Sequence, residues 1–119
     1  MGTVLLFHVN MFKSSQIINL CKAQKHVAVL VPKSDYAKTL GALANISGMK
    51  SNASYKGEEF LDEMMVFSGM DSDTMDRFLL EYKKNNIAPI KRKAMLTPTN
   101  VMWSAEKLYK ELEDHVTGI

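Results

Sequence analysis

The chain has 119 residues, of which 46% are hydrophobic and 24% are charged, and its formal net charge is +2 at pH 7. This is an ordinary globular composition, and one compact domain of this length buries enough surface to fold without a disulfide or a metal. The charge is too small for a dedicated nucleic-acid binder. The single cysteine, Cys21, excludes an internal disulfide and a zinc site built on paired cysteines.

The first residues form an apolar run without a targeting signal. Residues 1–7 contain no Lys or Arg, which a signal peptide would require, and the run is too short to span a membrane. We therefore expect a cytoplasmic protein without membrane contact. A short continuous apolar run is typical of a buried strand, which we place at residues 3–9.

Residues 1–46 show the pattern strand, helix, strand, helix. Ser14 is the predicted N-cap of the first helix, whose apolar residues recur at helical spacing. Residues 27–31 form a second apolar strand. Ser34 is the predicted N-cap of the second helix, in which Gly41 indicates a close packing contact.

Residues 47–62 form an irregular connection with few periodic apolar residues. A connection of this length is unusual in a small domain, and is typical of a lid, a binding loop or a mobile linker. The acidic residues at the end of the connection are Glu58, Glu59, Asp62 and Glu63. Such an acidic run ordinarily belongs to a solvated loop.

Residues 63–117 repeat the pattern. A strand at 64–67 is followed by a helix capped near Asp71, a strand at 90–96, and a last helix with Ser104 as N-cap. The strand at 90–96 contains charged residues, which are typical of the edge of a sheet because they discourage unwanted pairing.

The alternation of strands and helices predicts an α/β fold with right-handed crossovers. We expect a single domain with a four-stranded, mostly parallel sheet of order 2-1-3-4, helices on both faces and βαβα-βαβα connectivity. An alternative is two half-domains packed as pseudo-symmetric mates. The likeness of residues 1–46 and 63–117 fits an old duplication, but any two strand–helix units would look similarly alike.

In a parallel sheet all carboxyl ends meet at one edge, so we expect four polar turns to converge there. Helix N-termini behind these turns offer free N–H groups to a small anionic ligand, such as a phosphate or a nucleotide-like molecule. The candidate ligand-binding residues are His8, Asn10, Ser68, Gly69, Thr97, Thr99 and Asn100. The alternative is that these residues are only caps, turn formers and, for His8, a structural histidine.

Known catalytic fingerprints are absent from the sequence. It has no glycine-rich nucleotide loop and no nucleophile elbow, so we expect no catalytic residue, no cofactor and no metal. The nine methionines either fill the core or form a partner surface. We expect a non-catalytic binding or regulatory module that forms a homo-oligomer. The alternative is a small-ligand-binding protein or enzyme, and nucleic-acid binding by the basic run Lys83, Lys84, Lys91, Arg92 and Lys93 is disfavoured.

The text K-R-K-A-M-L-T-P-T-N-V-M-W-S-A-E-K-L-Y-K-E-L at residues 91–112, with the helix before it, resembles a bacterial family described as a domain of unknown function (DUF3783). The resemblance implies a bacterial, intracellular protein. It directs attention to Thr97, Asn100 and Trp103, and it carries no reaction.

Overall fold

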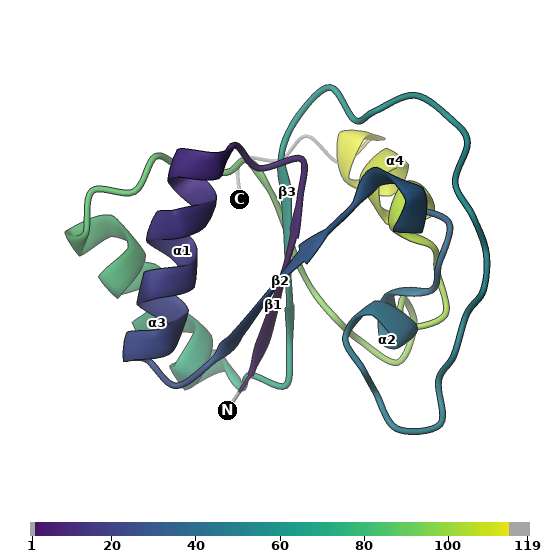
Figure 1. Cartoon of the computed structure of the whole chain (residues 1–119). Coiled ribbons are helices and arrows are strands. Elements are labelled where there is room, and N and C mark those ends of the chain that lie inside the picture. Colours follow the sequence, from purple (N-terminus) through teal and green to yellow (C-terminus); the bar gives the residue numbers. More distant parts are fainter. Residues whose placement is uncertain (1, 115–119) are drawn as a thin grey trace.

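The computed structural model describes residues 2–114 and contains a four-stranded sheet with helices on both faces (Figure 1). The strands are β1 (Thr3–Phe7), β2 (Val27–Val31), β3 (Met64–Ser68) and β4 (Arg92–Met95). The helices are α1 (Met11–Ala23), α2 (Leu40–Leu43), α3 (Ser72–Lys84) and α4 (Ala105–Asp114), and a 3-10 helix, η1 (Lys33–Asp35), precedes α2. The strand order β2-β1-β3-β4 confirms the predicted order.

The sheet is mixed, because its two central strands run in opposite directions. β1 pairs in parallel with β2, and β3 pairs in parallel with β4. β1 and β3 are antiparallel, with Thr3 opposite Ser68 and Phe7 opposite Met64. The expectation of a mostly parallel α/β sheet is therefore confirmed, but the expectation that all strands end at the same edge is wrong.

Each face of the sheet carries one pair of helices, α1 and α3 on one side and α2 and α4 on the other (Figure 1). Successive residues of a strand point to opposite faces. In β1, Val4 and Leu6 pack with α1 and α3, whereas Leu5 and Phe7 pack with α2 and α4. The central strands are thus buried on both faces, which explains their continuous apolar runs.

The first strand ends, and the first helix begins, at earlier residues than predicted. His8 has a φ of 59° and ends β1 at Phe7 rather than at residue 9. Asn10, not Ser14, is the N-cap of α1, because its side chain accepts a hydrogen bond from the Lys13 N–H. Ser14 lies inside the helix, where its hydroxyl donates to the Val9 carbonyl at 3.1 Å.

The second helix begins later than predicted. Ser34 lies in η1, and α2 starts after Thr39, whose Oγ1 accepts from the Ala42 N–H at 3.3 Å. The close contact predicted at Gly41 is confirmed. A Cβ there would overlap the sulfur of Met49 and lie 2.9 Å from a methyl carbon of Val101.

In the second half the predicted caps are confirmed. Asp71 accepts from the Thr74 N–H at 2.8 Å, and Ser104 accepts from the Lys107 N–H at 3.1 Å. β4 lies at an edge of the sheet, as its charges predicted, but it covers only Arg92–Met95 rather than residues 90–96.

The irregular connection is fixed to the body of the protein by aromatic side chains. Phe60 is 5% exposed and stacks between the rings of Tyr36 and Tyr109, with centroid distances of 4.1 and 4.0 Å. Earlier in the connection, the Tyr55 N–H donates to the Ser34 carbonyl. The end of the connection is therefore part of the core rather than a detached lid.

Candidate functional site

The predicted site is divided between two ends of the sheet. Because β1 and β3 are antiparallel, the turn after β1, with His8 and Asn10, lies opposite the turns after β3 and β4. The other five predicted residues lie at the second end: Ser68, Gly69, Thr97, Thr99 and Asn100. The predicted convergence of all seven residues is wrong, and whether either group binds a ligand stays a prediction.

At the first end, His8 faces a carboxylate from the connection. Its Nδ1 lies 3.6 Å from Oε2 of Glu59, and both side chains are partly exposed. The other oxygen of Glu59 accepts hydrogen bonds from the Tyr36 hydroxyl at 2.7 Å and from the Phe60 N–H at 2.9 Å. Burial, with a smaller effect of the Glu59 hydrogen bond, raises the pKa of Tyr36 far above its usual value. Glu59 thus holds the connection against η1.

The N-terminus of α1 already has an anionic partner within the protein. Oε2 of Glu63 accepts from the Asn10 N–H at 3.4 Å, and Oε1 lies 2.5 Å from Nζ of Lys13. The Asn10 side chain caps the Lys13 N–H. Glu59 and Glu63 are therefore not merely solvated, and a carboxylate of the chain itself lies where an external anion was expected.

At the second end, the turn after β4 is closed by its own hydrogen bonds. The Asn100 side chain accepts from the Thr97 N–H at 2.8 Å and donates to the Met95 carbonyl at 3.1 Å. The Asn100 N–H donates to Oγ1 of Thr97 at 3.2 Å. Asn100 is 9% exposed, and both its side-chain oxygen and its side-chain nitrogen bond to the backbone of the turn. Thr97 and Asn100 thus shape the turn, as the alternative interpretation of these residues expects.

Replacing Asn100 with alanine is expected to lower the free energy of unfolding by about 1–3 kcal/mol, because two backbone groups lose their partner in a buried turn. Urea unfolding followed by circular dichroism measures the change. Thr99→Ala is the matched control. Thr99 is exposed and has no side-chain hydrogen bond among the described residues, so its loss should change stability by less than about 0.5 kcal/mol. Equal effects of both changes would contradict this role for Asn100.

Ser68 and Gly69 belong to the end of β3. Ser68 is the last residue of the strand and pairs with Thr3. Gly69 has a φ of 73°, a conformation that favours glycine, and it leads the chain to the Asp71 cap of α3. Both residues therefore serve the strand-to-helix turn.

The N-termini of α2 and α4 are closed by reciprocal hydrogen bonds between the two halves of the chain. The Gly41 N–H donates to the Val101 carbonyl at 2.9 Å, and the Glu106 N–H donates to the Tyr36 carbonyl at 3.1 Å. Thr39 and Ser104, the two N-caps, form an isolated antiparallel bridge. These N–H groups have protein partners, so the expectation of free helix N-termini is wrong for this pair.

Neither a metal centre nor a reactive thiol is found in the described part of the chain. No group of three or more His, Cys, Asp or Glu side chains there is placed to hold a metal ion. Cys21 is buried in α1, and burial raises its pKa to about 11, which keeps the thiol protonated. Among residues 2–114 no helix has the length and apolar character needed to cross a membrane.

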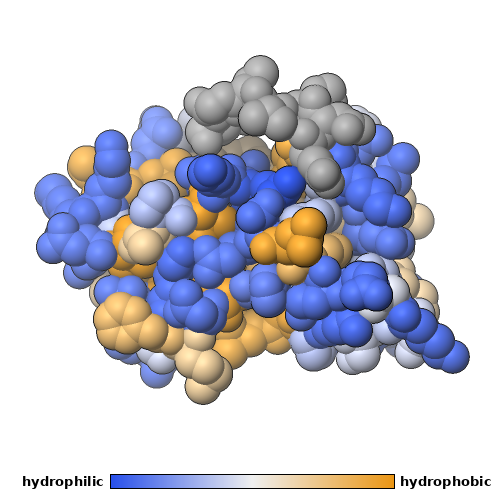
Figure 2. Space-filling view, turned by 90° about the horizontal axis from the view of Figure 1, so that it is seen from above, coloured by the Kyte–Doolittle hydropathy of each residue, from blue (hydrophilic) through white to orange (hydrophobic). Residues whose placement is uncertain are grey.

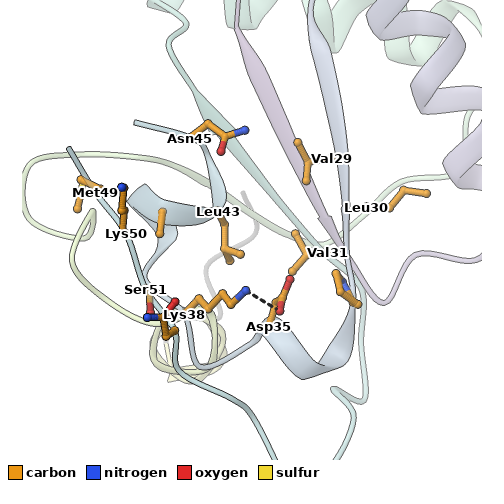
Figure 3. Close-up of a pocket in the computed structure, with 13 residues that line it drawn as sticks. Val29, Leu30, Val31, Asp35, Lys38, Leu43, Asn45, Met49, Lys50 and Ser51 are labelled. Atoms are coloured by element: carbon orange, nitrogen blue, oxygen red, sulfur yellow. Dashed lines mark ion pairs between the residues drawn. The ribbon is translucent and has the colours of Figure 1, made fainter. Parts of the chain in front are cut away.

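A groove of about 460 Å³ follows the free edge of β2 (Figure 3). Val29 and Val31 form one wall, α2 and the segment from Asn45 to Asn52 form the other, and the ion pair between Asp35 and Lys38, at 3.0 Å, lies in it. No sequence pattern predicted this groove. The one sequence feature that pointed to this place is β2 itself. It is an apolar strand without charges, and the predicted order already placed it at an edge of the sheet.

The comparisons with known proteins identify one family. Residues 63–115 match the model of the family described as a domain of unknown function (DUF3783), which confirms the resemblance noted in this part of the sequence. The matched region contains β3, α3, β4 and α4. No curated protein and no solved structure matches the chain significantly.

Proposed function

We propose that the chain is a non-catalytic binding module that self-associates by pairing β2 with the β2 of a second copy. The observation that carries the proposal is the free edge of β2. This strand, V-A-V-L-V, contains no charged residue, and Val27 and Leu30 are 48% and 52% exposed. An apolar edge strand presents unpaired N–H and C=O groups to any strand that can lie beside it.

The opposite edge of the sheet differs in its charge. β4 begins with Arg92 and Lys93, and the exposed Lys91 precedes it. Cationic side chains on an edge strand oppose pairing with another copy, because like charges would come close together. Since only β4 carries this protection, β2 is the edge at which pairing is expected.

The sequence of β2 suits pairing about a two-fold axis. The Val27 N–H donates to the Gly2 carbonyl at 2.9 Å, so by the alternation of the strand the N–H groups of Ala28 and Leu30 point away from β1. An axis through Val29 would place Ala28 opposite Leu30 of the second copy. These two residues would then exchange both backbone hydrogen bonds, as antiparallel strands do.

The surface around β2 is suited to this contact. Met11 and Phe12, at the start of α1, are 83% and 76% exposed, and Met11 lies with Leu30 around one hollow. Figure 2 looks onto the end of the sheet where α1 begins and shows a group of hydrophobic side chains toward its lower left. On the other face, the groove beside β2 leaves room for the Val27 and Val29 side chains of the second copy.

Replacing Leu30 with lysine is expected to weaken the dimer at least about tenfold, because it removes apolar contact and places two like charges near the axis. Size-exclusion chromatography with light scattering measures the mass over a range of protein concentrations. Leu80→Lys is the matched control, since Leu80 is 53% exposed on α3, away from this edge.

The expected result is a dimer for the wild type and for Leu80→Lys, and a monomer for Leu30→Lys at the same concentration. A wild-type chain that remains monomeric at millimolar concentration would overturn the proposal. A dimer that is unaffected by Leu30→Lys would also overturn it, since the interface would then lie elsewhere.

A further inference from the structure

A second hollow lies at the opposite edge of the sheet from β2, between the end of α3 and β4. Its volume is about 580 Å³, within the usual range for small-molecule sites. Buried core side chains form its floor: Met65, Tyr82, Ile87 and Ile90, each no more than 5% exposed. Leu79, Ala88 and Pro89 complete the apolar wall.

The polar residues around this hollow are Lys83, Asn86 and Lys93, and no acidic residue lines it. Lys83 is exposed at the end of α3 and has no ion-pair partner among the described residues. Lys93 also lines the hollow, and its Nζ donates to the Ile90 carbonyl at 3.1 Å. Two lysine side chains therefore line an apolar hollow that has no carboxylate among its lining residues.

The Ile90 carbonyl accepts from Nζ of Lys93, whereas the backbone carbonyls at the end of α3 already have N–H partners. The last carbonyls of α3 accept from the N–H groups of Asn85, Asn86 and Ile87. The Tyr82 hydroxyl is likewise occupied, since it donates to the Ala88 carbonyl at 2.6 Å. Burial is the main reason that the pKa of Tyr82 rises to about 12, so the hydroxyl adds no negative charge near neutral pH.

We propose that this hollow binds a small amphipathic carboxylate. The apolar body of the ligand lies on the floor between Met65 and Ile90, and its carboxylate lies at the rim between Lys83 and Lys93. Small-ligand sites commonly combine apolar walls with a few polar groups that fix the orientation. The site is independent of self-association, because it lies at the β4 edge of the sheet.

Octanoate is a suitable probe, and 1-octanol, which lacks the charge, is its matched control. In a titration of the isotopically labelled protein followed by NMR, octanoate should shift the amide signals of Leu79, Ile87 and Ala88 with a saturable dependence on concentration. Octanol should bind at least about tenfold more weakly, because it makes no charge-assisted contact.

The double variant Lys83→Gln/Lys93→Gln should weaken octanoate binding by about tenfold or more and leave octanol binding unchanged. Lys84→Gln is the matched control, because Lys84 is the neighbouring lysine and does not line the hollow. The proposal is overturned if octanoate causes no saturable shift at millimolar concentration. It is also overturned if octanol binds as tightly as octanoate, or if Lys84→Gln has the effect of the double variant.

Discussion

Phe60→Ala is expected to lower the free energy of unfolding by about 3–5 kcal/mol, the usual cost of removing a buried aromatic ring. The ring is 5% exposed and is stacked on both sides, at 4.1 Å from the Tyr36 ring and 4.0 Å from the Tyr109 ring. Its removal leaves a cavity between η1, α4 and the sheet, and also frees the end of the connection. Chemical unfolding followed by tyrosine and tryptophan fluorescence measures the loss.

The adjacent residue gives a matched control for this prediction. Leu61 is 91% exposed, so Leu61→Ala should change the stability by no more than about 0.5 kcal/mol. If Phe60→Ala were as mild as Leu61→Ala, the connection would behave as the detached lid or linker that its sequence suggests. A large difference between these two neighbours is the result that a core-anchored connection predicts.

Lys13→Met is expected to cost about 3 kcal/mol, because it leaves a shielded carboxylate without its cation. Lys13 is 8% exposed, and its ammonium contacts Oε1 of Glu63 and the Pro89 carbonyl. These contacts connect α1 to the beginning of β3 and to the segment before β4. The loss therefore falls on the junction between the two halves of the chain.

A double-mutant cycle with Glu63→Gln isolates the contribution of this ion pair. The coupling energy should exceed about 1 kcal/mol, whereas the exposed pair of Lys84 and Glu81, with its charged atoms 3.8 Å apart, should show less than about 0.5 kcal/mol in the same experiment. A coupling near zero between Lys13 and Glu63 would show that the effect of Lys13→Met comes from packing alone.

Most of the fold could be predicted from the sequence, because the apolar runs, the helix caps and the edge charges match the positions that these residues occupy in the structure. β1 and β3 are continuous apolar runs, which is what strands buried on both faces require, and Asp71 and Ser104 cap helices where their spacing indicates. The charges at Arg92 and Lys93 placed β4 at an edge. Each of these features depends on a few neighbouring residues and can be read without knowledge of the tertiary structure.

The direction of β3 could not be predicted in this way. An apolar run such as M-M-V-F is equally suited to a parallel and to an antiparallel neighbour, and the connection before it is long enough to reach either end of β1. The choice depends on tertiary contacts, among them Phe60 in the aromatic stack and Glu63 beside Lys13. Neither residue belongs to a periodic pattern that would have indicated its burial.

The prediction that the seven candidate site residues converge is wrong for the same reason. The convergence of the seven residues requires a parallel sheet, and the central antiparallel pair separates His8 and Asn10 from the other five. Asn100 illustrates a second difficulty. An asparagine in a polar turn is equally compatible with ligand binding and with closing the turn, and only its bonds to Thr97 and Met95 distinguish the two.

Amide hydrogen exchange at β2 tests the proposed self-association most directly. The N–H groups of Ala28 and Leu30 point away from β1 and should exchange rapidly in dilute protein, whereas that of Val29, which faces β1, should exchange slowly. Raising the protein concentration should slow exchange at Ala28 and Leu30 by about tenfold or more once the dimer predominates, and Leu30→Lys should abolish this protection. Exchange at Ala28 and Leu30 that does not change with protein concentration would contradict the pairing of β2 with a second copy.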